Sequence, residues 1–144
     1  MFDGNFRPQV EAKLKPVGQQ IKRTGITADH LTIAGLVMAV GAAVVISFGW
    51  WHLGLLFVVL TGVPDLLDGA VAKASGTAGP RGAFFDSVSD RVTDALLFGA
   101  IAINYSQNQP NWVWLPVAVL ASASWVSYIR AKAESLGFDA SGGM

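Results

Sequence analysis

Two long stretches without a charged residue decide what this chain can fold into. No Lys, Arg, Asp or Glu occurs at residues 31–64, or again at residues 95–129. Each stretch holds roughly 35 residues, whereas one membrane-spanning helix needs about 20. Each therefore predicts two spans joined by a tight turn, and we place these turns at residues 48–52 and 104–112. Both turns contain tryptophan, which suits the membrane–water interface.

The charged residues gather toward one end of the four predicted spans. Only 14% of the residues are charged, against about 25% in soluble domains, and the ten basic residues balance the ten acidic ones. By the positive-inside rule, the charged end faces the cytoplasm. The chain has no cysteine, which excludes a disulfide framework and thiol chemistry. We expect an all-α membrane protein with four transmembrane helices.

Residues 1–29 predict an amphipathic juxtamembrane helix and the cap of the first span. Apolar residues recur at spacings of three and four between five basic residues, which are Arg7, Lys13, Lys15, Lys22 and Arg23. Such a helix lies on the membrane surface with its basic face toward lipid headgroups. A solvated basic arm with no binding role is the alternative.

Four aspartates lie where the charged end meets the predicted spans. Asp65 and Asp68 are one helical turn apart near the end of the second span, and Asp86 and Asp90 are stacked near the start of the third. A Gly/Pro/Ser-rich turn at residues 74–81 joins the two pairs. Charge inside a membrane is costly, so such carboxylates favour a functional interpretation. If the two helices pack antiparallel, we expect all four side chains to converge.

Converging carboxylates repel one another and need protons or cations between them. Oxygen ligands without Cys or His select hard divalent ions such as Mg²⁺ or Mn²⁺, and four carboxylates can hold two of them. A two-metal site suits in-line displacement at phosphorus. Gly69, Ala72 and Gly82 leave the acidic face nearly free of side chains, so a ligand can approach the backbone there.

The pattern Asp65-x-x-Asp68-Gly69-x-x-Ala72-Lys73, followed by Gly82-x-x-x-Asp86-x-x-x-Asp90, resembles the signature of the CDP-alcohol phosphatidyltransferases. The family usually has Arg in place of Lys73, which keeps the charge and loses the bidentate fork. The resemblance covers nearly the whole chain. The run SYIRAKAESLG from Ser127 is similar to a helix end in the actinobacterial phosphatidylinositol phosphate synthases of this family.

The resemblance implies transfer of the phosphatidyl group of CDP-diacylglycerol to inositol 1-phosphate, with release of CMP. It implies two Mg²⁺ or Mn²⁺ ions on Asp65, Asp68, Asp86 and Asp90, with Asp90 also the general base. It further implies a homodimer in the plasma membrane, with the site open to the cytoplasm. The expected partners include membrane lipids and no nucleic acid.

The resemblance also assigns two groups of binding residues. We expect CDP-diacylglycerol to contact Thr27, Ala28, Asp29, His30, Gly69, Lys73, Gly79 and Gly82. We expect the phosphate of the acceptor to contact Ser127, Arg130 and Lys132. From charge alone, these last residues fit equally well as topology-fixing charges that reach the headgroups. Asp94 lies outside the motif, and we expect it to pair with Arg91 or Arg81.

Several alternatives remain at this point. Glycerol 3-phosphate as acceptor would make the chain a phosphatidylglycerophosphate synthase, and a non-catalytic member of the family is a further alternative. A cation transporter or channel would carry polar residues toward both sides of the membrane, whereas here the outer halves of the spans are apolar. Family members have six spans, so we expect residues 1–144 to be a single domain that is incomplete at its C-terminus.

Overall fold

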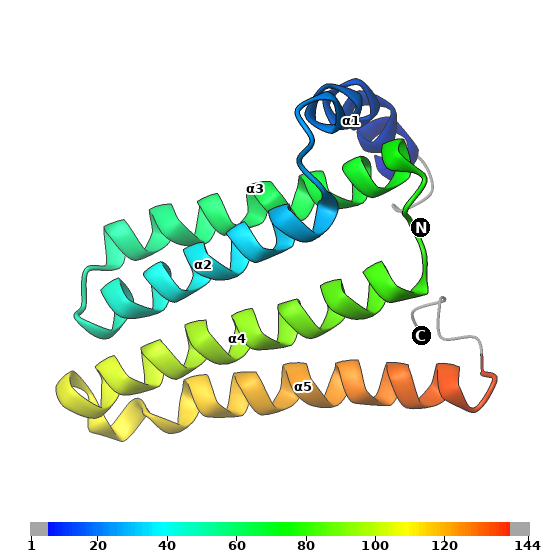
Figure 1. The fold of residues 1–144 in the computed structure, drawn as a ribbon. Coiled ribbons are helices and arrows are strands. Elements are labelled where there is room, and N and C mark those ends of the chain that lie inside the picture. Colours follow the sequence, from blue (N-terminus) through cyan, green and yellow to red (C-terminus); the bar gives the residue numbers. More distant parts are fainter. Residues whose placement is uncertain (1–5, 139–144) are drawn as a thin grey trace.

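The computed structural model describes residues 6–138, with the side chains of residues 6–13 and 15 left out. These residues form five α-helices and one short 3₁₀ turn, without a strand (Figure 1), in agreement with the all-α prediction. The elements are α1 Phe6–Arg23, α2 Ala28–Ser47, α3 Trp51–Ser75, α4 Pro80–Asn108, η1 Pro110–Trp112 and α5 Trp114–Ser135. The outermost residues of the predicted domain, 1–5 and 139–144, lie outside the described ones.

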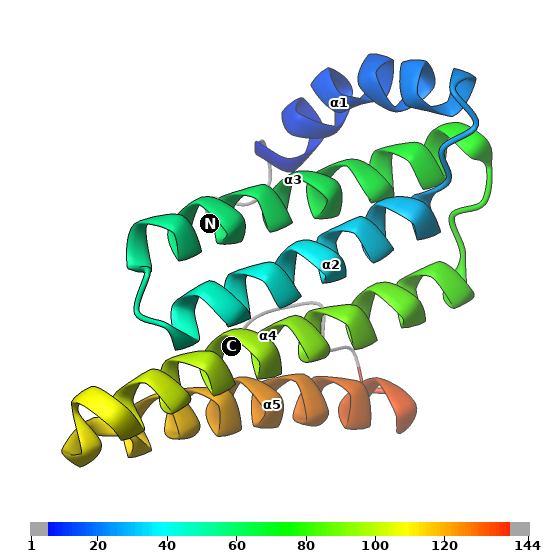
Figure 2. The same ribbon diagram turned by 60° about the vertical axis from the view of Figure 1, so that its left-hand side comes forward.

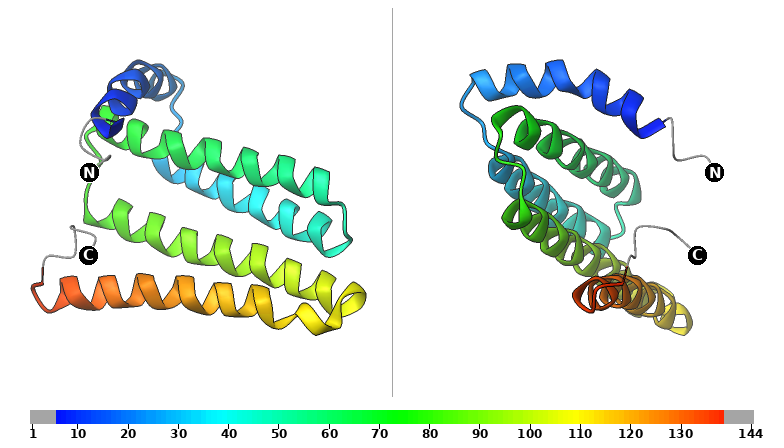
Figure 3. Two further views of the ribbon diagram at one scale, coloured as in Figure 1. Left: turned by 180° about the vertical axis from the view of Figure 1, so that it is seen from behind. Right: turned by 90° about the vertical axis from the view of Figure 1, so that its right-hand side faces the viewer.

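The four long helices run side by side in the order α3, α2, α4, α5, and α1 packs on α3 at one edge of the row (Figure 2). Seen along their axes, they form a stepped row with α1 above α3 (Figure 3). The α2–α3 and α4–α5 hairpins are those that the uncharged stretches predict. However, α3 and α4 pack mainly on α2 rather than on each other. The helix α2 therefore lies between the two helices that carry the aspartates.

Three segments are long and apolar enough to cross a membrane: Ala28–Ser47, Trp51–Ser75 and Pro110–Ser135. The longest helix, α4, is not among them, because three aspartates and two arginines occupy its first half. Its role as a span therefore stays a prediction, supported by its place between α2 and α5 in the row.

The turns show where local sequence signals suffice and where they fail. The first predicted turn is confirmed, since α2 ends at Ser47 and α3 begins at Trp51. The turn predicted for residues 104–112 was placed too early, because α4 continues to Asn108. Asn104 is buried inside α4, and its side-chain amide donates to the Ser47 carbonyl at 3.4 Å. The Ser47 carbonyl has no partner within α2 because it lies at the helix end, so it can accept the hydrogen bond from Asn104, the polar residue that had suggested a turn.

The connection at the acidic end is short. Gly76, with a φ of 70°, ends α3 in the left-handed conformation that glycine adopts readily. Pro80 then begins α4, two residues earlier than the sequence suggested, at the first-turn position that proline favours. The helix ends that carry the two acidic pairs are thereby held close together.

The helix α1 is seated directly on this end of α3. A Cβ atom added to Gly18 would lie 2.7 Å from the Ala70 carbonyl oxygen, so the two helices touch backbone to backbone. Lys22 Nζ donates to the Ala74 carbonyl at 2.9 Å. Contact of α1 with a membrane stays a prediction, and three residues of its predicted basic face, Arg7, Lys13 and Lys15, lie outside the described side chains.

Candidate functional site

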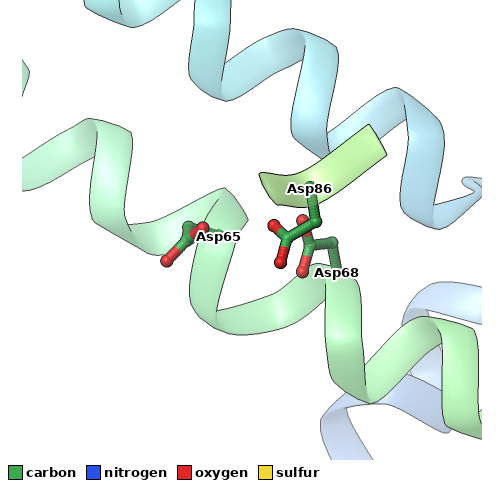
Figure 4. Close-up of side chains that lie close together, drawn as sticks. All are labelled: Asp65, Asp68 and Asp86. Atoms are coloured by element: carbon green, nitrogen blue, oxygen red, sulfur yellow. The ribbon is translucent and has the colours of Figure 1, made fainter. Parts of the chain in front are cut away.

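Three of the four motif aspartates meet in the space between α3 and α4. One carboxylate oxygen from each of Asp65, Asp68 and Asp86 lies within 4.8 Å of the others (Figure 4). Asp65 and Asp68 come from adjacent turns of α3, and Asp86 comes from the second turn of α4. Their convergence across α2 gives the oxygen-rich donor set that a divalent cation such as Mg²⁺ or Mn²⁺ prefers.

The three carboxylates differ in their surroundings. Asp65 is exposed, Asp86 is half-buried, and Asp68 is only 9% exposed. The Thr32 hydroxyl on α2 lies 2.9 Å from Asp68 Oδ2. It also lies 3.2 Å from the backbone carbonyl of Ala28, one turn earlier in the same helix. Thr32 therefore supports the buried aspartate from behind, and the sequence analysis missed it.

Asp90 lies apart from this group. It is one turn beyond Asp86 on α4, it is exposed, and it lines the same cavity as the three clustered carboxylates. Its carboxylate is 3.9 Å from Arg91 Nη2. The structure thus places Asp90 beside the cluster rather than in it.

Two cavities meet at the aspartates. The first, of about 220 Å³, is lined by all four motif aspartates and extends between apolar and small residues of α2, α3 and α4, including Gly35, Leu36, Val58, Gly62 and Leu97. The second, of about 200 Å³, lies toward α1 and the α3–α4 connection. Thr32, Asp68 and Asp86 line both, so they form a shared wall.

The second cavity collects most of the residues expected to contact CDP-diacylglycerol. Six of the eight line it: Ala28, Asp29, Gly69, Lys73, Gly79 and Gly82. The first turns of both α2 and α4 border this cavity, and helix N-termini favour anions such as phosphate. The second cavity is therefore suited to an anion, and the carboxylates of the shared wall are suited to a cation.

The other two residues of that group, Thr27 and His30, form the cap of α2. Thr27 Oγ1 accepts from the backbone N–H of His30 at 3.3 Å, and the Thr27 N–H donates to His30 Nδ1 at 3.3 Å. Asp29, in the same turn, pairs with Arg81 Nη2 at 3.1 Å and so links the beginnings of α2 and α4. Thr27 and His30 are thus occupied in holding the helix end that borders the second cavity.

The three residues expected to contact the acceptor phosphate do not converge. Ser127 faces α4, where its Oγ accepts a hydrogen bond from Arg91. Arg130 pairs with Glu134 of its own helix at 3.2 Å, and Lys132 is exposed. Arg91, which the sequence suggested only as a partner of Asp94, indeed pairs with Asp94 at 3.3 Å and in addition reaches α5.

Replacing Thr32 by valine is expected to weaken Mn²⁺ binding by about 10–100-fold, because Asp68 loses the partner that orients it. The two side chains have nearly the same shape, so the fold should persist. Titration of the purified chain with Mn²⁺, followed by electron paramagnetic resonance, measures the change.

Thr61→Val is the matched control for this measurement. Thr61 lines the same cavity, but its hydroxyl donates to the Phe57 carbonyl of its own helix at 2.9 Å. We expect Thr61→Val to bind Mn²⁺ like the unaltered chain. Equal affinities for the Thr32 and Thr61 variants would show that Thr32 does not support the metal site.

Comparison with known proteins identifies the family and several similar proteins. The sequence model of the CDP-alcohol phosphatidyltransferase family matches residues 25–141. The phosphatidylinositol phosphate synthase of Streptomyces avermitilis is 35% identical over 127 residues, which cover 86% of this chain and 52% of that relative. This chain thus spans about half the length of that protein.

Two crystal structures of the Mycobacterium tuberculosis phosphatidylinositol phosphate synthase share the fold, both at 28% sequence identity. The one with CDP-DAG bound has a TM-score of 0.80 and is covered to 67%, with 91% of this chain aligned. The one in complex with manganese and citrate has a TM-score of 0.81 and is covered to 64%, again with 91% of this chain aligned. The stepped row of helices is therefore an arrangement already seen in solved proteins.

Proposed function

The chain belongs to the CDP-alcohol phosphatidyltransferase family, and from this premise we propose that it transfers the phosphatidyl group of CDP-diacylglycerol to inositol 1-phosphate. The products are CMP and phosphatidylinositol phosphate. The observation that carries the proposal is the cluster of Asp65, Asp68 and Asp86, which lines the first cavity and, through Asp68 and Asp86, borders the second cavity, which is suited to an anion. The name of the Streptomyces relative and the CDP-DAG bound to the Mycobacterium protein support the choice of substrates.

The donor set fits a divalent metal ion. Three carboxylate oxygens within 4.8 Å of one another, with no nitrogen or sulfur among them, match the preference of Mg²⁺ and Mn²⁺. Asp65, Asp68 and Asp86 would hold one ion, and Asp86 together with Asp90 would hold a second. Bound there, the metal neutralises charge on the pyrophosphate and on the departing CMP. The manganese in one Mycobacterium structure supports a metal of this class.

The surrounding residues of the second cavity would bind and orient the nucleotide end of CDP-diacylglycerol. Gly69 and Gly82 carry no side chain, and a Cβ atom added to either would meet nothing within 4 Å, so the pyrophosphate can come close to the helices. The beginnings of α2 and α4 would direct backbone N–H groups toward it. The reacting phosphorus would then lie at the wall that Thr32, Asp68 and Asp86 form.

Asp90 is the general base in this proposal. It takes the proton from the acceptor hydroxyl as the oxygen forms its bond to phosphorus, and the bond from phosphorus to CMP breaks. Asp90 lines the first cavity, and the next residue along α4, Arg91, contacts α5. An acceptor whose phosphate lies at Ser127, toward which Arg130 and Lys132 would have to turn, would then have its hydroxyl on the side of Asp90.

The proposal includes a homodimer in the plasma membrane with the site open to the cytoplasm. The segments long and apolar enough to span a membrane support an integral location. The basic residues Lys73, Arg81 and Arg130 lie at the same end of the helices as the aspartates, which supports the orientation.

The experiment that tests the function follows CMP release by the purified chain in lipid vesicles with CDP-diacylglycerol and Mg²⁺. Inositol 1-phosphate and glycerol 3-phosphate are offered in separate reactions. We expect release with inositol 1-phosphate, and we expect EDTA to abolish it. Release with glycerol 3-phosphate alone would keep the family chemistry and change the acceptor. Release that survives EDTA would overturn the metal mechanism, and no release with either acceptor would favour a non-catalytic member.

A further inference from the structure

Arg91 hydrogen-bonds the α4 helix of the aspartates to α5. Its Nη1 donates to Ser127 Oγ and to the Ala123 carbonyl, the latter at 3.4 Å. Its Nη2 lies 3.3 Å from Asp94 Oδ2 and 3.9 Å from Asp90 Oδ2. One guanidinium thus joins two backbone turns of α5 to two carboxylates of α4, while its side chain stays 40% exposed.

The shape of the guanidinium explains why an arginine can make all of these contacts at once. Its N–H donors project from a rigid plane in different directions, so one edge can face α5 while the other faces the acids. The ammonium group of a lysine is a single point of charge and cannot reach both edges. Because Arg91 follows Asp90 directly, any movement of its side chain away from α5 also changes the surroundings of that carboxylate.

The contact with Arg91 determines which way the Ser127 hydroxyl can donate. A guanidinium has donors and no acceptor, so Ser127 Oγ must be the acceptor of this hydrogen bond. The single hydroxyl proton of Ser127 is therefore left to point elsewhere. It is available for an anion, and the partial positive charge that Arg91 places on the hydroxyl makes it a stronger donor.

We propose that Arg91 is a positioning residue, which holds the Ser127 hydroxyl as a donor to the phosphate of the acceptor and keeps α5 in register with the turn of Asp90. The inference rests on the proposed function, because it takes the acceptor to be a phosphorylated alcohol. Arg91 acts through Ser127 and does not touch the substrate. A merely structural tie between the helices would instead affect stability and both substrates alike.

A double-mutant cycle tests this role. Arg91→Gln and Ser127→Ala are each expected to raise the KM for inositol 1-phosphate by about tenfold, the worth of one hydrogen bond to a charged group. The double variant should be no worse than the more affected single variant, because both changes remove the same donor. The KM for CDP-diacylglycerol should stay unchanged. Independent losses that multiply in the double variant, or equal changes in both KM values, would overturn the proposal.

Two further variants separate positioning from folding. Arg91→Lys keeps the charge beside Asp94, so it should melt near the temperature of the unaltered chain and still raise the KM for inositol 1-phosphate. Ser122→Ala removes another α5 hydroxyl, which donates to the Ala118 carbonyl of its own helix, and should leave both KM values unchanged. A lysine variant with the KM values of the unaltered chain would show that only the charge matters and would overturn the role of the fork.

The same cycle can be measured without turnover, which distinguishes failure of this inference from failure of the function. Titration calorimetry of the Mn²⁺-loaded chain with inositol 1-phosphate gives a dissociation constant for each variant. If CMP release is absent but the Arg91 and Ser127 variants lose binding together, the proposed function fails and the positioning role stands. Independent losses of binding, or no binding by the unaltered chain, would overturn the positioning role.

Discussion

Replacing Asp68 by asparagine is expected to weaken Mn²⁺ binding by more than about 100-fold, since loss of an outer partner of a ligand already costs about 10–100-fold. CMP release should disappear with the metal. Asp68 is the most buried member of the cluster and borders both cavities, so no water-exposed carboxylate can take its place. Mn²⁺ titration followed by electron paramagnetic resonance measures the affinity.

The stability of the same variant provides an internal check. Three carboxylates within 4.8 Å of one another repel in the absence of a cation. Removing the charge of Asp68 relieves that repulsion, so the metal-free variant should melt no lower than the unaltered chain. Asp94→Asn, which removes another acid of α4 outside the cluster, should leave Mn²⁺ affinity unchanged. An Asp68 variant with undiminished affinity would place the metal elsewhere.

Replacing Asp90 by asparagine is expected to lower turnover by about 10²–10⁴-fold, the usual contribution of a general base. Binding of CDP-diacylglycerol should be largely retained, because Asp90 stands outside the cluster of three and does not line the second cavity. CMP release measured beside equilibrium binding of labelled CDP-diacylglycerol separates the two effects.

The outcomes of this experiment point to different roles. Retained turnover would remove Asp90 from the chemistry. Loss of CDP-diacylglycerol binding together with turnover would instead show that Asp90 acts mainly by holding the metal ions rather than as the base. Asp90→Glu moves the carboxylate outward by one methylene, so we expect partial turnover from it, and this variant shows whether a base at that turn is what matters.

The helices and the first turn could be predicted because the membrane imposes simple rules. A stretch without charge that is nearly twice as long as one span must fold back on itself, and residues 31–64 do so. The second turn was misplaced because Asn104 reads as polar in sequence, whereas its partner is a carbonyl 57 positions away. No local pattern reveals such a partner.

The aspartates of the site could be predicted in part, from spacing within each helix. Spacing brings Asp65 and Asp68 to one face of α3, but it does not tell that α2 lies between α3 and α4. That order makes Thr32 a neighbour of Asp68 and leaves Asp90 outside the cluster. In the same way, the rotation of α5 against α4 brings Ser127 to Arg91, and this rotation depends on packing between the hairpins.

The contact at Gly18 has a mechanical consequence. Where two helices meet through side chains, flexible side chains can absorb a small shift, but here the α1 backbone rests on the backbone of Ala70. Ala70 adjoins Gly69, which lines the second cavity, and Lys22 holds the next turn through Ala74. We therefore expect a tilt of α1 to move α3 and the rim of that cavity with it, so that the two helices move as one rigid unit.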